Sequence, residues 1–174
     1  MMDRSLYPMS AEMNEQRYPF AVMALTPLVA IFIQAYVPLR FPKFEILDLP
    51  LIVTLYFDLA RRSQVYGALL GTGTGILQDA LTHLPLGING ICKAIVGYLA
   101  ASVSNRLDVE NTGARLVLVL VLTMLHSVLH LVIVRLMLDL HPGWHWGYEF
   151  LRAALNTFVS LIFFKLLDLF RRQN

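Results

Sequence analysis

The sequence has few charged residues and a single cysteine. Charged residues make up 15% of the 174 residues, against 57% hydrophobic residues and a mean hydropathy of +0.61, whereas soluble domains carry about 25% charged residues. The net charge is only +2, which excludes the strongly basic surface of a nucleic-acid-binding protein. The lone Cys92 excludes an intrachain disulfide and a cysteine-rich zinc or iron–sulfur site.

What the sequence has instead is a series of hydrophobic stretches. Two stretches, residues 18–39 and 116–134, carry no charge and are long enough to cross a bilayer as helices of about 20 residues. Four further stretches contain ionisable residues, namely 44–60, 63–81, 86–104 and 148–170. The sequence therefore predicts an all-α polytopic integral membrane protein, with about six transmembrane helices in a single bundle over residues 18–170. Residues 44–60 are alternatively re-entrant, because Asp48 and Asp58 interrupt them.

Lysine and arginine residues are unevenly divided between the two sides of this predicted bundle. One side has only Arg40 and Lys43, and the other has eight arginines: Arg4, Arg17, Arg61, Arg62, Arg106, Arg115, Arg171 and Arg172. Short cytoplasmic loops hold the excess of such residues. We therefore expect both termini in the cytoplasm, with residues 1–17 as a short tail and residues 171–174 as the C-terminus.

Glycines cluster in the middle of the chain. Gly67, Gly71 and Gly75 are spaced four residues apart, so on a helix they form one smooth stripe that another helix can approach closely. This stripe predicts either packing inside the bundle or contact with a partner protein. The run from Gly71 to Gly75 is not a phosphate loop, because it follows no strand and lacks the Lys-Ser/Thr pair.

Polar residues interrupt the hydrophobic stretches on both sides of the next turn. Asp79 precedes this turn, and Gly87, Asn89 and Lys93 follow it, so we expect them to form a polar hairpin near the outer face. Their distances from the turn predict an ion pair between Asp79 and Lys93, or a polar pocket that both share. Charges within spans often mark function, but simple mutual neutralisation explains them equally well.

Two further pairs of residues follow from helix geometry. Arg135 and Glu149 are equally far from Pro142, which predicts a structural ion pair across a hairpin. His126 and His130 share one helix face, but no carboxylate accompanies them, so we expect neutral imidazoles bonded to Asn156 or Ser160 in preference to a metal site. No nucleophile, base and orienting group can be assembled, so the sequence predicts no catalytic residues, no metal site and no cofactor.

The segment Gly75-Ile-Leu-Gln-Asp79, followed after seven residues by Gly87, resembles the MreD family of rod shape-determining membrane proteins. The resemblance implies a non-enzymatic scaffold in the bacterial cytoplasmic membrane that helps to coordinate peptidoglycan synthesis with the cytoskeleton. The partners that it implies are MreC and membrane lipids. It also implies direct or indirect association with MreB filaments, RodA and a transpeptidase. It also implies a fold similar to the substrate-binding subunits of energy-coupling-factor transporters. That similarity suggests an alternative, a transporter subunit with an outward pocket for a small solute. The residues expected to frame this pocket are Asp79, Asn89, Lys93 and the tryptophans Trp144 and Trp146.

Overall fold

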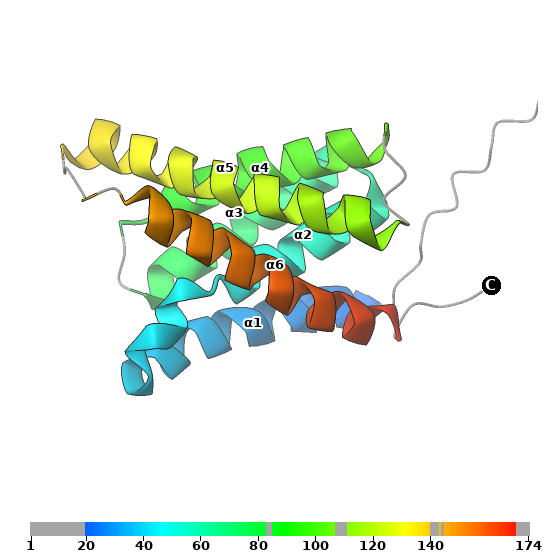
Figure 1. Ribbon diagram of the computed structural model, residues 1–174, viewed down its shortest axis with the longest axis horizontal. Helices are drawn as coiled ribbons and strands as arrows, with labels where there is room; N and C mark the ends of the chain where they lie inside the picture. The colour runs from blue at the N-terminus through cyan, green and yellow to red at the C-terminus, as the bar shows by residue number, and fades with distance from the viewer. Residues whose placement is uncertain (1–19, 83–84, 107–110, 140–142, 144, 170–174) are drawn as a thin grey trace, which may run out of the picture.

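The computed structural model describes residues 20–82, 85–106, 111–139, 143 and 145–169, and every secondary-structure element in this part of the chain is a helix. Its elements are α1 (Phe20–Arg40), the 3-10 helix η1 (Pro42–Ile46), α2 (Leu49–Arg61), α3 (Gln64–Leu81), α4 (Ile88–Ser104), α5 (Thr112–Leu138) and α6 (Trp146–Asp168). The prediction of an all-α chain with six helices is therefore confirmed. The helices pack as one bundle, and α1 begins at the same end of it at which α6 finishes (Figure 1). The ends predicted for the chain, residues 1–17 and 171–174, lie outside the described residues.

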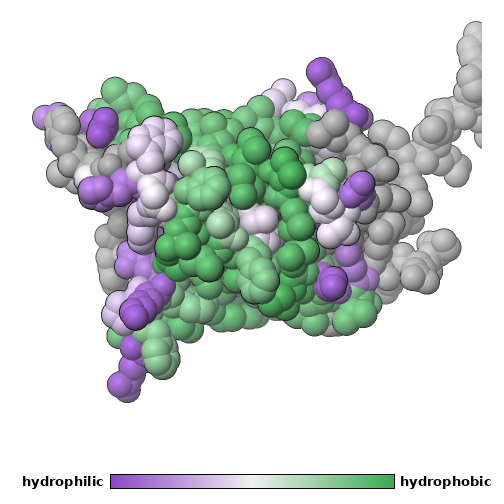
Figure 2. Space-filling view, viewed as in Figure 1, coloured by the Kyte–Doolittle hydropathy of each residue, from purple (hydrophilic) through white to green (hydrophobic). Residues whose placement is uncertain are grey.

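The surface of the bundle is strongly apolar. By length and composition, α1, α5 and α6 can each cross a membrane, and no more than 33% of the most hydrophobic segment of each is buried inside the protein. Exposed apolar side chains include Leu39, Leu69, Val117 and Leu136. Figure 2 shows a broad hydrophobic band across the middle of one face, with hydrophilic residues toward both ends. A surface of this kind is stable in lipid, because water would have to hydrate a large apolar area.

The shortest α-helix, α2, is the centre of the bundle. It contacts α1, α3, α4, α5 and α6, and every residue from Leu49 to Ala60 is buried. Its 13 residues correspond to about 20 Å, which is shorter than the hydrocarbon thickness of about 30 Å. The predicted span 44–60 is therefore η1 followed by a short helix that is surrounded by protein rather than by lipid.

The glycine stripe brings α3 and α4 into backbone contact. A Cβ added at Gly67 would lie 2.6 Å from the carbonyl oxygen of Gly97, and one at Gly75 would lie 2.5 Å from the backbone of Asn89. A Cβ at Gly71 would overlap the carbonyl group of Lys93. All three glycines thus face another helix of the same chain, so the stripe is not a surface that a partner protein can reach.

Candidate functional site

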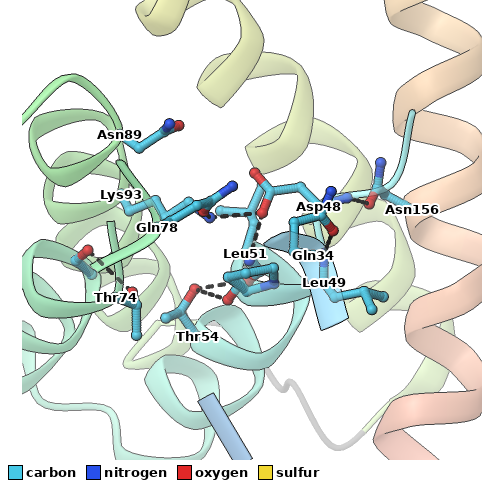
Figure 3. A network of polar contacts seen from close by, with 12 residues as sticks. Gln34, Asp48, Leu49, Leu51, Thr54, Thr74, Gln78, Asn89, Lys93 and Asn156 are labelled. Carbon is cyan, nitrogen blue, oxygen red and sulfur yellow. Dashed lines mark hydrogen bonds and ion pairs between the residues drawn. The ribbon is translucent and has the colours of Figure 1, made fainter. Parts of the chain in front are cut away.

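A network of polar residues lies inside the bundle, around the N-terminus of α2 (Figure 3). Asp48 caps this helix, because its Oδ1 atom accepts a hydrogen bond from the backbone nitrogen of Leu51 at 3.0 Å. The same oxygen accepts from Nζ of Lys93 at 2.7 Å, and both charged side chains are buried. An ion pair in such surroundings is stable only when further hydrogen bonds satisfy its remaining polar atoms.

Lys93 links three helices through its hydrogen bonds. Its Nζ atom also donates to Oε1 of Gln78 at 2.6 Å, so a side chain from α4 joins the start of α2 to α3. The expected ion pair between Asp79 and Lys93 does not form. The prediction considered only how far residues of one hairpin lie from its turn, so it missed Asp48, which is 45 residues away from Lys93 in the sequence. Asp48 contacts Lys93 because α2 packs between the other helices.

Asp79 instead caps the N-terminus of α4. Its Oδ2 atom accepts from the backbone nitrogens of Gly87 at 2.9 Å and Asn89 at 3.1 Å, and its Oδ1 atom accepts from Nδ2 of Asn89 at 2.8 Å. The first turn of a helix has backbone N–H groups without partners inside the helix, and a carboxylate is favoured there. The segment from Gly75 to Asp79, with Gly87, therefore encodes a closely packed hairpin whose second helix is capped by the first.

Gly87 lies at the turn with a φ of +100° and a ψ of −13°. No heavy atom lies within 4 Å of a Cβ placed there. We expect Gly87→Ala to lower the free energy of unfolding by about 1–2 kcal/mol, because left-handed backbone is costly for a residue with a side chain. Unfolding of the purified protein by titration with SDS would measure this. Gly147→Ala in α6, where a Cβ also meets nothing within 4 Å, is the control, and an equal effect of the two substitutions would contradict the explanation.

Helices α6 and α1 supply further contacts of the N-terminus of α2. Oδ1 of Asn156 accepts from the backbone nitrogen of Asp48 at 2.8 Å, while its Nδ2 atom donates to the carbonyls of Ile46 and Arg152. From α1, Oε1 of Gln34 accepts from the backbone nitrogen of Leu49 at 3.2 Å. Side chains from α1 and α6 thus accept hydrogen bonds from backbone N–H groups at the start of α2. Lipid chains offer no such acceptors.

A cavity of about 750 Å³ opens beside this network, at the end of the bundle where α1 finishes and α4 begins. Its polar lining comes from η1 and from the six α-helices or their caps, and includes Gln34, Glu45, Asp48, Gln78, Thr82, Asn89, His130 and Arg152. The volume lies in the range of small-molecule sites. Of the residues expected to frame an outward pocket, Asn89 lines the cavity, whereas Asp79 and Lys93 are buried behind it.

The family model described as rod shape-determining protein MreD matches residues 14–172 of the chain. The chain belongs to the MreD family. No curated protein and no solved structure matches it. The match covers all six helices, so rod-shape determination is the biological role of the family to which this whole membrane bundle belongs.

His126 and His130 of this MreD-family chain do not have the partners expected from the sequence. Asn156 binds the start of α2, and the hydroxyl of Ser160 donates to the carbonyl of Thr157 at 2.7 Å. Nε2 of His126 is buried without a hydrogen bond to any described residue, and its ring centre lies 6.4 Å from that of His130. Within the described ranges, no three histidine, cysteine or acidic residues are grouped closely enough to hold a metal ion.

The expected ion pair between Arg135 and Glu149 also differs from what the structure records. Glu149 lies 4.0 Å from Arg152, one turn later on its own helix. Arg135 is exposed in the last turn of α5, and in the described part of the chain no salt bridge joins it to Glu149. The midpoint assumed for the hairpin, Pro142, lies outside the described residues. The equal spacing of two residues from it does not fix which way their side chains point.

A third buried carboxylate, besides those of Asp48 and Asp79, lies near the other end of α2. Both oxygens of Asp58 are buried without a hydrogen-bond partner among the described residues. They lie beside the crossing of α3 and α4, 3.3 Å from a Cβ placed on Gly67 and 2.8 Å from one placed on Gly97. The close backbone contact between Gly67 and Gly97 therefore lies beside an acidic side chain.

Proposed function

We propose that the protein is a non-catalytic membrane scaffold of the bacterial cell-elongation complex. In this role it binds MreC, associates directly or indirectly with MreB, RodA and a transpeptidase, and helps to coordinate peptidoglycan synthesis with the cytoskeleton. The observation that carries the proposal is the match to the rod shape-determining MreD family over residues 14–172. The large apolar surface of α1, α5 and α6 supports it, because membrane partners make their contacts on such faces.

The proposal includes an orientation in the cytoplasmic membrane, with both termini in the cytoplasm. Arg61, Arg62, Arg106 and Arg115 lie where α2 ends, α3 begins, α4 ends and α5 begins, all at one end of the bundle. Arg40 and Lys43 lie at the opposite end. The excess of arginine supports a cytoplasmic location for the first end, so the polar cavity would open to the outside.

Affinity purification from the native bacterium in a mild detergent tests the scaffold role. We expect MreC among the recovered proteins, enriched over a preparation that uses an unrelated polytopic protein with the same tag. Equal recovery of MreC with both proteins, when the tagged chain is intact and in the membrane fraction, would contradict the proposal.

The second candidate function is a subunit that binds a small solute for transport. The cavity of about 750 Å³ beside the polar network is the observation that favours it. The expected likeness to the substrate-binding subunits of energy-coupling-factor transporters has no support among solved structures, so we do not propose that fold relationship. Uptake of a labelled solute by cells, lost when the gene is deleted and restored by its return, would favour transport over scaffolding.

A further inference from the structure

Four buried side chains of the polar network each have two polar atoms. One atom is hydrogen-bonded inside the protein, and the other is left for the cavity. Oε1 of Gln34 accepts from Leu49, and Oε1 of Gln78 accepts from Lys93. Nδ2 of Asn89 donates to Asp79, and Oδ1 of Asp48 accepts from Leu51 and Lys93. The other polar atom of each side chain makes no hydrogen bond to any described residue, and all four residues line the cavity.

The partners inside the protein fix which atom faces the cavity. An N–H donor requires a carbonyl oxygen opposite it, and the Asp79 carboxylate requires the amide nitrogen of Asn89. The cavity therefore receives two amide NH2 groups, from Gln34 and Gln78, and two acceptor oxygens, Oδ1 of Asn89 and Oδ2 of Asp48. Figure 3 shows these side chains gathered around the start of α2. A ligand that satisfies all four must both donate and accept hydrogen bonds at several points.

The buried charges in the wall of the cavity already have partners of opposite charge. Lys93 pairs with Asp48 from behind the wall, Glu149 lies 4.0 Å from Arg152, and the remaining charged residue of the lining, Glu45, is exposed. A ligand with a net charge would therefore lose its hydration without an uncompensated opposite charge to receive it. Large exposed apolar residues, namely Tyr36, Leu39 and Leu81, form part of the rim.

We propose that this cavity binds an uncharged polyol, such as a sugar, either as a free solute or as the headgroup of a lipid. Hydroxyl groups donate and accept at the same atom, which suits two amide nitrogens and two oxygens in one lining. The apolar rim allows a lipid to keep its chains in the bilayer while its headgroup enters. The site does not rest on the proposed scaffold role, because residues of this chain form its lining.

Binding is tested on the full-length protein in lipid nanodiscs. Saturation-transfer NMR with glucose tests a free solute, and native mass spectrometry of protein from nanodiscs that contain glucosyl diacylglycerol tests a lipid headgroup. Gluconate and glucosamine serve as the anionic and cationic probes. We expect saturable binding of glucose or of the glucosyl lipid, with both charged probes bound at least about tenfold more weakly.

Gln34→Glu is the variant that examines the site most precisely. It keeps the oxygen that accepts from Leu49 and replaces the donor that faces the cavity with an acceptor, so binding should fall about tenfold or more. Ala80→Trp fills the cavity from its wall and should abolish binding. Val65→Trp, an exposed position on the same helix, should leave binding unchanged.

Binding of glucose would identify a free solute, and binding of the glucosyl lipid alone would identify a headgroup; either result supports the site. The proposal is overturned if neither probe binds saturably, if a charged probe binds as well as glucose, or if Gln34→Glu binds like the unchanged protein. Should Ala80→Trp fail to insert, Gln34→Glu decides the question, because it preserves the internal hydrogen bond.

Discussion

Lys93→Met is expected to lower the free energy of unfolding by about 3–5 kcal/mol, because it leaves the buried Asp48 carboxylate without its countercharge. A loss of this size is a large part of the total stability of about 5–15 kcal/mol that folded domains have. Methionine keeps the length and apolar volume of the lysine side chain, so the effect reports the charge rather than a cavity. Unfolding by SDS titration and the amount of protein in the membrane fraction would both measure it.

Two further variants separate the ion pair from general effects of the substitution. Lys165→Met removes an exposed lysine of α6 and should change stability little. Asp48→Asn combined with Lys93→Met removes both charges, while asparagine can still cap α2. The double variant should therefore be more stable than Lys93→Met alone. A Lys93→Met protein as stable as Lys165→Met would show that the pair does not hold the bundle together.

Gly71→Ala is expected to lower the free energy of unfolding by about 1–3 kcal/mol, since its Cβ would overlap the backbone of α4 at Lys93. A backbone atom cannot move aside as a flexible side chain does, so α3 and α4 must separate. That movement would also pull Gln78 away from Lys93. We therefore expect the glycine substitution to weaken the polar network, although it introduces no polar change of its own.

Gly73→Ala, two residues later on the same helix, is the matched control. A Cβ at Gly73 meets nothing within 4 Å, and alanine is the better helix former by up to about 1 kcal/mol. Stability should therefore stay the same or rise. Equal losses for Gly71→Ala and Gly73→Ala would contradict the packing described here. Because Gly71 faces α4, its substitution reports the stability of the bundle and not a missing partner contact.

The helices could be predicted from the sequence because each is a long hydrophobic stretch. The expected stretch 63–81 agrees closely with α3 (Gln64–Leu81), and 86–104 agrees with α4 (Ile88–Ser104). The expected stretch 116–134 is shorter than α5 (Thr112–Leu138), since Arg115 and Arg135 set its limits although helices extend beyond the hydrocarbon region. Hydropathy also does not distinguish a helix surrounded by lipid from one surrounded by protein, so the central place of α2 could not be predicted.

The polar network shows why the site was only partly predictable. Asp79, Gly87, Asn89 and Lys93 were recognised because they interrupt hydrophobic stretches on two neighbouring helices. The contact between Asp48 and Asn156 joins residues 108 positions apart, and no local spacing reports such a pairing. Gln34 could have been recognised as part of a polar site, because an amide inside an otherwise apolar stretch needs a buried hydrogen-bond partner. Which partner it finds depends on how the helices pack.

Depletion of this protein from its native bacterium is the measurement that tests its role in rod shape most directly. We expect rod-shaped cells to round up as the protein is lost, and to recover their shape when the unchanged protein or Lys165→Met is supplied. Lys93→Met should restore the shape poorly, in proportion to its lower amount in the membrane. Cells that remain rods after complete depletion would contradict a role in rod-shape determination for this chain.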